Sequence, residues 1–272
     1  MAKGAAKTDQ DKALSLFARS GYASRGIVYL LIGGLAALAA FGQGGQTKGS
    51  RGALERLLMA PGGSVLLGAV AIGLLGYATW RLIQAVRDTD HHGTDTKGIV
   101  IRSGLMVSAI THILLAYFAA NLIFHFAASS GDSGGGSQGA ATELMKLPFG
   151  QWLVGAVGLA IIGAGIAHGI KGWKAQFDRH FDMPLSTQQW AYPICRFGLA
   201  TRGLAFVLVG SFFIIAAYQF KPDEAGGLAE VFSTLRSQAF GRWLLAFVAI
   251  GLFSFGLYSL LEAVYRRVNP SS

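Results

Sequence analysis

The chain has 272 residues, of which 52% are hydrophobic and only 14% are charged, and its net charge at pH 7 is +9. A typical soluble domain carries about 25% charged residues. This composition therefore excludes a disordered chain and is typical of an α-helical protein that crosses a membrane several times. The single cysteine, Cys195, excludes an internal disulfide and any thiolate zinc or iron–sulfur site built from this chain alone.

Six apolar stretches have the length of about 20 residues that a helix needs to cross a bilayer. Because a helix satisfies its own backbone hydrogen bonds in lipid, each stretch is predicted to be helical. The first stretch also has features of a cleavable signal peptide, namely a basic start and the sequence "ALA" at 37–39. Its similarity to two later segments favours a helix that is retained. The predicted spans are 20–41, 64–86, 101–126, 150–172, 195–219 and 241–265.

Three copies of one two-helix unit are visible in the sequence. The first helices read "ARSGYASRGIVYLLIG" at 18–33, "IRSGLMVSAITHILLA" at 101–116 and "CRFGLATRGLAFVLVG" at 195–210. The second helices begin with "PGGSVLLGAVAI" at 61–72, "PFGQWLVGAVGL" at 148–159 and "AFGRWLLAFVAI" at 239–250. The chain is therefore predicted to form three repeated hairpins in a pseudo-threefold arrangement. Their predicted bounds are 16–90, 98–180 and 190–268, after a flexible basic N-terminus at 1–15.

Two smaller features also recur in the copies. A short amphipathic segment precedes each second helix, at 51–59, 139–147 and 227–237, and is predicted to be a helix on the membrane surface. Small residues recur seven apart in the first helices, as Gly26 and Gly33, Ala109 and Ala116, and Gly203 and Gly210. Since small residues let membrane helices approach closely, we expect a compact bundle without a wide water-filled pore.

The distribution of positive charge predicts the orientation in the membrane. Lysines and arginines near span ends are retained on the cytoplasmic side. Most of them lie in the N-terminus, in the connectors after the second and fourth spans, and in the C-terminal tail. Both termini are therefore predicted to be cytoplasmic. This topology accounts for the excess of positive charge in the chain. The sequence shows no basic face that would bind nucleic acid.

The chain resembles a known family. The Arg-x-Gly start at 19–21, followed by "LLGAVAIGLLGYATWRL" at 66–82, resembles the bacterial family catalogued as domain of unknown function 1206. In that family the two-helix unit is typically present three times, and the resemblance covers residues 16–268. The resemblance implies a fold of three two-helix repeats, and it implies no activity, cofactor or catalytic residue. The middle copy departs from the pattern, with Ser108 where its siblings have Arg25 and Arg202.

The repeated arginines are the first candidate site. Arg19, Arg102 and Arg196 share one column of the repeat. Arg25 and Arg202 lie six residues deeper, about 9 Å along the helix axis. A guanidinium presents a planar fork of donors that suits a phosphate, so these residues are predicted to bind anionic headgroups or an anionic solute. The alternative interpretation is structural, with the arginines as topology anchors that contact helix ends.

A second polar column lies on the second helices. It contains Arg81, His168 and Ser259, followed three residues later by Gln84, Lys171 and Glu262. Residues at this spacing share one helix face, so they are expected either to form a polar mouth near the arginines or to make a plain interfacial ring. Glu262 is expected to pair with an arginine. Arg81 and His168 join the five arginines as predicted anion-binding residues.

The histidines raise the question of a cofactor. His112 lies about 15 Å into the third span, and together with His168 it could ligate a haem iron. The other copies carry Tyr29 and Phe206 in place of His112, which favours a packing role with a hydrogen bond to a neighbour. His91 and His92 lie in an Asp-rich loop, where weak metal binding is the alternative to a solvated loop. We therefore predict no cofactor and no metal.

The sequence contains no P-loop, H-E-x-x-H or G-x-S-x-G motif. The first hypothesis is a non-enzymatic protein of the bacterial inner membrane. It would bind membrane lipids, anionic ones above all, or serve as an accessory subunit of a larger membrane protein complex. The second hypothesis is a small-anion transporter or channel along the pseudo-threefold axis, and an enzyme is the third.

Overall fold

The computed structural model describes residues 2–45, 47–125, 135–175, 178 and 181–268. These residues form nine α-helices and no β-strand. Six of the helices are long and apolar enough to cross a membrane, as predicted. The helices are α1 (Ala2–Ala40), α2 (Gly49–Leu58), α3 (Gly63–Arg87), α4 (Thr96–His125), α5 (Gly135–Met145), α6 (Gly150–Trp173), α7 (Leu185–Gln219), α8 (Leu228–Arg236) and α9 (Gly241–Tyr265).

All three first helices begin earlier than the sequence analysis predicted, α4 by five residues and α1 and α7 by more. Helix α1 starts at Ala2, so most of the segment predicted as a flexible N-terminus belongs to a helix. That segment lacks proline and is rich in alanine and lysine, which are good helix formers. Helix α7 starts at Leu185 and continues through Pro193. The helix tolerates this proline in its interior, because neighbouring groups in a membrane bundle can satisfy the backbone carbonyl that loses its hydrogen bond.

The three short helices α2, α5 and α8 confirm the amphipathic segments as helical. Each is joined to the following long helix by a tight turn that ends on a glycine, at Gly63, Gly150 or Gly241. A Cβ atom at these glycines would lie within 2.1–2.3 Å of a carbonyl oxygen of the short helix. Only a residue without a side chain fits such a close approach, which explains why the same glycine recurs in all three copies.

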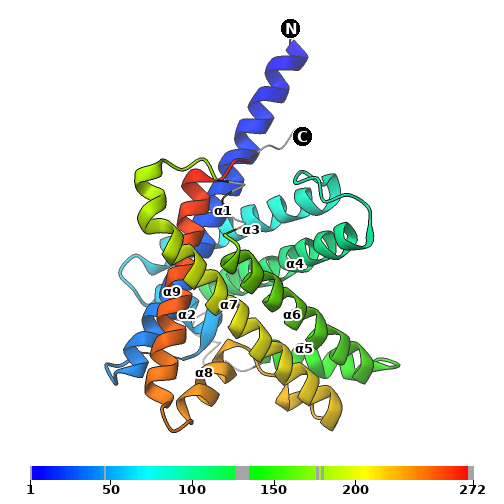
Figure 1. The fold of residues 1–272 in the computed structure, drawn as a ribbon, viewed down its shortest axis with the longest axis vertical. Helices are drawn as coiled ribbons and strands as arrows, with labels where there is room; N and C mark the ends of the chain where they lie inside the picture. The colour runs from blue at the N-terminus through cyan, green and yellow to red at the C-terminus, as the bar shows by residue number, and fades with distance from the viewer. Residues whose placement is uncertain (1, 46, 126–134, 176–177, 179–180, 269–272) are drawn as a thin grey trace.

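The six long helices pack as three antiparallel pairs. The most extensive contacts join α1 to α9, α3 to α4 and α6 to α7. Each pair thus combines the first helix of one copy with the second helix of another. In Figure 1, α1 and α9 run side by side, whereas α6 and α7 run diagonally towards the lower right; both termini lie at the top. We call the end with both termini the terminal end.

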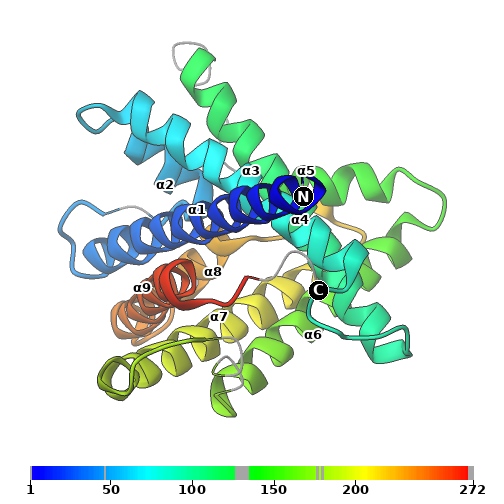
Figure 2. The same ribbon diagram turned by 90° about the horizontal axis from the view of Figure 1, so that it is seen from above.

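Contacts within a copy differ between the three copies. Helix α1 packs on α3, and α7 packs on α9, but α4 and α6 of the middle copy make no extensive contact in the described chain. Figure 2 shows the bundle from above, with its helices spreading outwards from the centre. Only 11% of the apolar window of α4 and 17% of that of α6 is buried, against 67% for α9. The middle copy therefore exposes most of its apolar surface.

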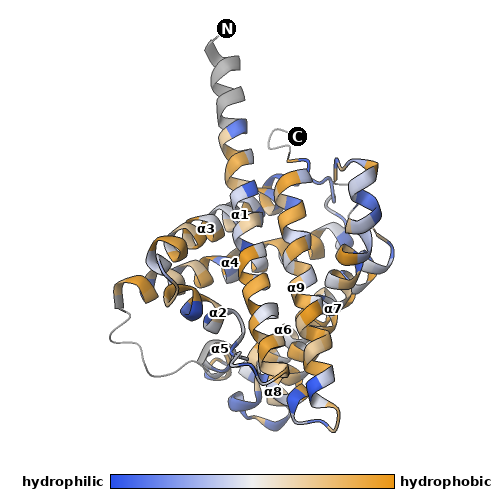
Figure 3. Cartoon of the chain, turned by 90° about the vertical axis from the view of Figure 1, so that its left-hand side faces the viewer, coloured by the Kyte–Doolittle hydropathy of each residue, from blue (hydrophilic) through white to orange (hydrophobic). Residues whose placement is uncertain are grey.

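Hydrophobic and hydrophilic residues occupy different parts of the bundle. The middle parts of the long helices are predominantly hydrophobic, and hydrophilic residues gather in the connectors and towards the terminal end (Figure 3). The core that joins α1, α3, α7 and α9 includes Leu74, Leu252 and Phe255, none of which is exposed. Cys195 is also fully buried in this core, where it packs as a small apolar side chain.

Glycines set the closest helix contacts. A Cβ atom on Gly21 would lie 2.4 Å from the backbone nitrogen of Tyr77, and one on Gly198 would lie 2.4 Å from that of Phe255. The first contact joins the two long helices of copy one, and the second joins those of copy three in the same way. The corresponding glycine of the middle copy, Gly104, has no atom within 4 Å of its Cβ position, which agrees with the separation of α4 from α6.

Two adjacent glycines of α1 provide a matched test of this packing. A Cβ atom at Gly33 would lie 2.5 Å from the backbone nitrogen of Phe253, whereas Gly34 has open space. We expect Gly33→Ala to destabilise the protein by about 1–3 kcal/mol through overpacking. Gly34→Ala should be neutral or stabilising by up to about 1 kcal/mol, because alanine is the better helix former. Thermal unfolding in detergent, followed by circular dichroism, measures both, and equal melting temperatures would contradict the packing.

Candidate functional site

The first column of arginines contacts helix ends. Each of the three donates to a backbone carbonyl in the last turn of the second helix of another copy. The contacts are Arg19 Nη1 to Ala263 O (2.8 Å), Arg102 Nε to Ala85 O (2.7 Å) and Arg196 Nη2 to Trp173 O (3.0 Å). These carbonyls have no donor within their own helix, and a cation there is also favoured by the helix dipole. The column therefore makes the helix-end contacts of the structural interpretation, and its remaining guanidinium donors are left for other partners.

Arg25 lies at the centre of a buried polar cluster. Its side chain is 2% exposed, and its Nε donates to the hydroxyl of Ser259 at 3.1 Å. One Nη donates to the hydroxyl of Tyr77, and the other forms an ion pair with the carboxylate of Glu262. The guanidinium is also within 5.3 Å of the ring centroids of Tyr22, Tyr77 and Phe255. Arg25 therefore joins α1 to both α3 and α9.

Glu262 is the acceptor on which several donors converge. Its second carboxylate oxygen accepts from the hydroxyl of Tyr258 at 2.9 Å and from Arg266 at 2.8 Å. Arg266 also lies 3.4 Å from the carboxylate of Asp90 in the α3–α4 loop. The expectation that Glu262 pairs with an arginine is confirmed, and it pairs with two.

Arg81 extends the same cluster along α3. Its Nε donates to the Tyr77 hydroxyl at 2.7 Å, and its Nη1 donates to Gln84 at 3.0 Å. Gln84 in turn donates to Asp90 at 2.7 Å. From α6, Lys171 donates to the hydroxyl of Tyr258 at 3.0 Å. The second polar column is therefore largely an internal network, since Gln84, Ser259 and Glu262 are each at most 1% exposed.

Arg202, like Arg25, lies close to the ring of Phe255. Its guanidinium carbon is 4.3 Å from the centroid of that ring, and that of Arg25 is 5.2 Å from it. The polar contact of Arg202 is with Nε2 of His168, at 3.2 Å from Nη1. Because Nδ1 of His168 donates to the carbonyl of Ala164, at 2.8 Å, Nε2 of the neutral ring accepts this bond.

The predicted anion-binding residues thus divide into two groups. Arg25, Arg81, Arg202 and His168 converge on the polar cluster, whereas Arg19, Arg102 and Arg196 lie apart at helix ends. Sequence reasoning missed Tyr77, Tyr258 and Arg266, which complete the cluster. Their signal was a spacing of four residues from Arg81 or Glu262, which places each of them on a face already identified as polar.

The histidines contact aromatic rings. The ring of His112 is 4.5 Å from that of Tyr77, and its Nδ1 lies 2.7 Å from the carbonyl of Ser108. This is the packing contact with a neighbouring hydrogen bond that the sequence suggested. In the described residues no group of three or more histidine, cysteine or acidic side chains could hold a metal ion.

The α3–α4 loop is organised by its own acids. The carboxylate of Asp88 accepts hydrogen bonds from the backbone N–H of Gly93 at 2.7 Å and of His92 at 2.8 Å, and these two bonds lower the pKa of Asp88.

Arg266 follows the last spanning helix. Burial opposes its charged form, but Tyr22, Glu262 and Asp90 outweigh this effect and raise the pKa of Arg266. The loop and the C-terminal segment are thus bound together by charge.

An open groove of about 840 Å³ lies between α6 and α7 at the terminal end. Gly169, Gly172 and Trp173 line it from α6, and Gln188, Tyr192 and Arg196 line it from α7. Trp173 is 78% exposed, and its ring centroid is 5.9 Å from the guanidinium carbon of Arg196. We call this the α6–α7 groove. It combines an exposed aromatic ring, a cation and an apolar floor.

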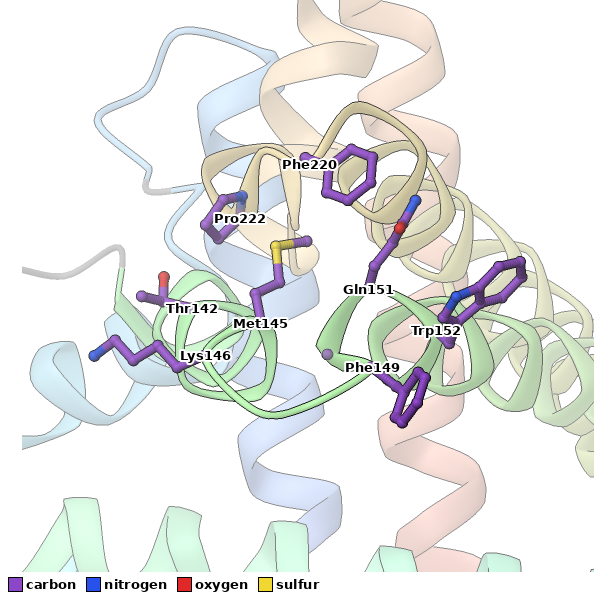
Figure 4. A pocket seen from close by; sticks show the side chains of 9 residues that line it. Thr142, Met145, Lys146, Phe149, Gln151, Trp152, Phe220 and Pro222 are labelled. Carbon is purple, nitrogen blue, oxygen red and sulfur yellow. The ribbon is translucent and has the colours of Figure 1, made fainter.

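A second hollow, of about 520 Å³, lies at the opposite end of α6. Figure 4 shows Phe149, Trp152, Phe220 and Met145 around it, with Lys146 extending away. The ammonium group of Lys146 lies 2.7 Å from Glu143, a neighbour on the same side. Thr142 and Gln151 are the uncharged polar residues of its lining, so this hollow is mainly aromatic and apolar, and Lys146 is directed away from it.

The Arg25–Glu262 pair gives a prediction of stability. Glu262→Gln leaves Arg25 buried without a carboxylate and takes from Arg266 the nearer of its two, so we expect a loss of about 3–5 kcal/mol. The control is Glu143→Gln, which breaks an ion pair whose side chains are 65% and 73% exposed. Exposed pairs contribute little, so this variant should melt like the wild type. If both variants melted alike in detergent, the buried pair would not hold the bundle together.

The chain is similar to known protein sequences. No solved structure matches the chain. A protein of Bacillus subtilis (strain 168), named "Uncharacterized protein YxxB", is 34% identical over 259 residues, covering 93% of this chain and 91% of that protein. The model of a family described as Domain of Unknown Function (DUF1206) matches residues 20–88, 103–175 and 197–266. Each matched segment is one of the three hairpins, and the chain therefore belongs to this family.

Proposed function

We propose that this protein is a non-enzymatic, multi-pass protein of the bacterial inner membrane that binds anionic phospholipid in the α6–α7 groove. The observation that carries the proposal is the presence of Arg196 and the exposed Trp173 in one open groove at the terminal end. Tryptophan favours the boundary between lipid tails and headgroups, and arginine favours the phosphate. The groove thus offers both halves of a phospholipid a suitable surface.

The donors of Arg196 support this proposal. A guanidinium has five N–H groups, and the hydrogen bond of Arg196 within the described structure uses one nitrogen, Nη2, towards Trp173. The other donors are available to a phosphate. Gly169 forms part of the groove wall, and no atom lies within 4 Å of its Cβ position, so its lack of a side chain leaves space in which an acyl chain can lie.

The orientation is part of the proposal. The terminal end contains most lysines and arginines near the spans, and positively charged connectors are retained in the cytoplasm. We therefore place both termini, and the α6–α7 groove, at the cytoplasmic leaflet. Anionic headgroups in that leaflet would meet a basic protein surface.

The pseudo-threefold arrangement is likewise proposed. It is supported by the way in which Arg19, Arg102 and Arg196 each contact a helix end of a different copy. The three major helix pairs also follow one rule, in which a first helix packs on the second helix of another copy. The separation of α4 from α6 is the departure from full symmetry.

The other hypotheses have weaker support. A path for a small anion along the central axis would need space there, but Arg25, Ser259 and Glu262 are almost fully buried by packed neighbours. A role as an accessory subunit is favoured by the large apolar surface of α4 and α6. That surface also suits lipid, so it does not distinguish the two roles.

Native mass spectrometry from mild detergent tests lipid binding. We expect the wild type to retain phosphatidylglycerol in preference to phosphatidylcholine, and Arg196→Gln to reduce the retained fraction several-fold. The matched control is Lys174→Gln, which removes an equal charge from an exposed residue that does not line the groove. Equal loss in both variants would indicate general attraction to the basic end, and no preference for phosphatidylglycerol in the wild type would refute the proposal.

A further inference from the structure

The two deep arginines occupy equivalent places in two copies but face different groups. Arg25 of the first copy faces Ser259 and, one turn further along α9, Glu262. Arg202 of the third copy faces His168 of α6, and the residue one turn further along that helix is Lys171. Where one interface supplies a carboxylate, the other supplies an amine. The repeat therefore points to a missing negative charge beside Arg202.

The surroundings of Arg202 do not provide that charge. The residue is 8% exposed, and its Nε is buried without a hydrogen-bond partner. Its other neighbours are the rings of Tyr29, Phe206 and Phe255, with centroids 4.3–5.3 Å from the guanidinium carbon. The neutral ring of His168 accepts a hydrogen bond but has no negative charge. Burial of a charge is costly unless an opposite charge accompanies it.

The carboxylates of the polar cluster are already engaged. Glu262 pairs with Arg25 and Arg266, and Asp90 also pairs with Arg266. Within the described residues, no ion pair joins Arg202 or Lys171 to a carboxylate; Lys171 contacts the hydroxyl of Tyr258 instead. The cluster therefore contains more buried cations than anions, and the excess lies on its α6 side.

The α6 side is also where the bundle is least closed. His168 and Lys171 are both half-buried, unlike Ser259 and Glu262 in the equivalent places of α9. Helix α6 makes no extensive contact with α4, and Gly104 of α4 has open space where its equivalents are packed. A ligand that approaches between these helices would meet the unbalanced cations without displacing a packed helix.

We propose that Arg202, together with His168 and Lys171, binds an oxyanion in the form of a carboxylate or phosphate group. The oxyanion takes the place that the Glu262 carboxylate has beside Arg25. It accepts from Nε of Arg202 and from the Lys171 ammonium, and it neutralises the excess positive charge. The group can belong to a free anion or to a lipid headgroup that enters between α4 and α6. This site is separate from the α6–α7 groove and does not depend on it.

The test compares the melting temperature of the purified full-length protein in a zwitterionic detergent with different anions at equal ionic strength. The probes are inorganic phosphate, acetate and a short-chain phosphatidylglycerol, with chloride as the reference. A ligand that binds only the folded protein raises the melting temperature, and we expect at least one probe to raise it by about 2–8 °C. A rise with phosphate or acetate identifies a free anion, and a rise with phosphatidylglycerol alone identifies a headgroup. No rise with any of the three would overturn the inference.

Two variants locate the response. Arg202→Met keeps a long side chain among the three rings but removes the charge, so the anion response should disappear. Lys171→Glu copies the arrangement around Glu262 into the second interface. It should melt above the wild type in chloride and should also lose the anion response. If both variants kept the full wild-type response, the site would not be at Arg202.

The groove variant separates this site from the proposed function. Arg196→Gln leaves the polar cluster intact, so it should show the full melting response even when it has lost bound phospholipid. If Arg196→Gln abolished the response and Arg202→Met did not, the effect would belong to the α6–α7 groove and the buried site would be refuted. Loss of lipid retention together with an unchanged response to free phosphate or acetate would leave the buried site standing by itself.

Discussion

The ion pair between Arg25 and Glu262 joins the first long helix of the chain to the last, across 237 residues of sequence. Taking two charges out of water costs several kcal/mol for each ion, and the cost is recovered only where other hydrogen bonds are complete. They are nearly complete here: Arg25 also contacts Ser259 and Tyr77, and Glu262 also accepts from Tyr258 and Arg266. The closure of α1 on α9 depends on this cluster.

The remaining interfaces are variations on this one. Each pairs a first helix with the second helix of another copy, and each has an arginine at the helix end. Their inner polar residues differ, because the Arg–Glu pair of one interface is replaced by Arg202 with His168 and Lys171 in the next. In the third, the cation Arg81 lies on the second helix and Ser108 on the first. Repetition thus preserves the packing while the charges change.

Much of this fold could be predicted from the sequence, because hydropathy and internal repetition are local signals. They gave the six spans, the three hairpins and the short helices, and the column at Arg81 and Glu262 was recognised as polar. The burial of that column could not be predicted, since it depends on how helices far apart in the sequence pack against one another. The role of Asp90 was hidden for the same reason, as its partner Arg266 lies 176 residues away.

The separation of α4 from α6 has a physical cause in the repeat itself. In the first copy, Gly21 packs on the backbone of Tyr77, and Arg25 lies 4.7 Å from the centroid of that ring. In the third copy, Gly198 and Arg202 contact Phe255 in the same two ways. The middle copy keeps the glycine as Gly104 but has Ser108 for the arginine and Ala164 for the ring. A cation over an aromatic ring contributes about 0.5–2 kcal/mol. The helix pair that lacks this contact is the pair that stands apart, and it does so on the side of the bundle where Lys171 of α6 is only half-buried.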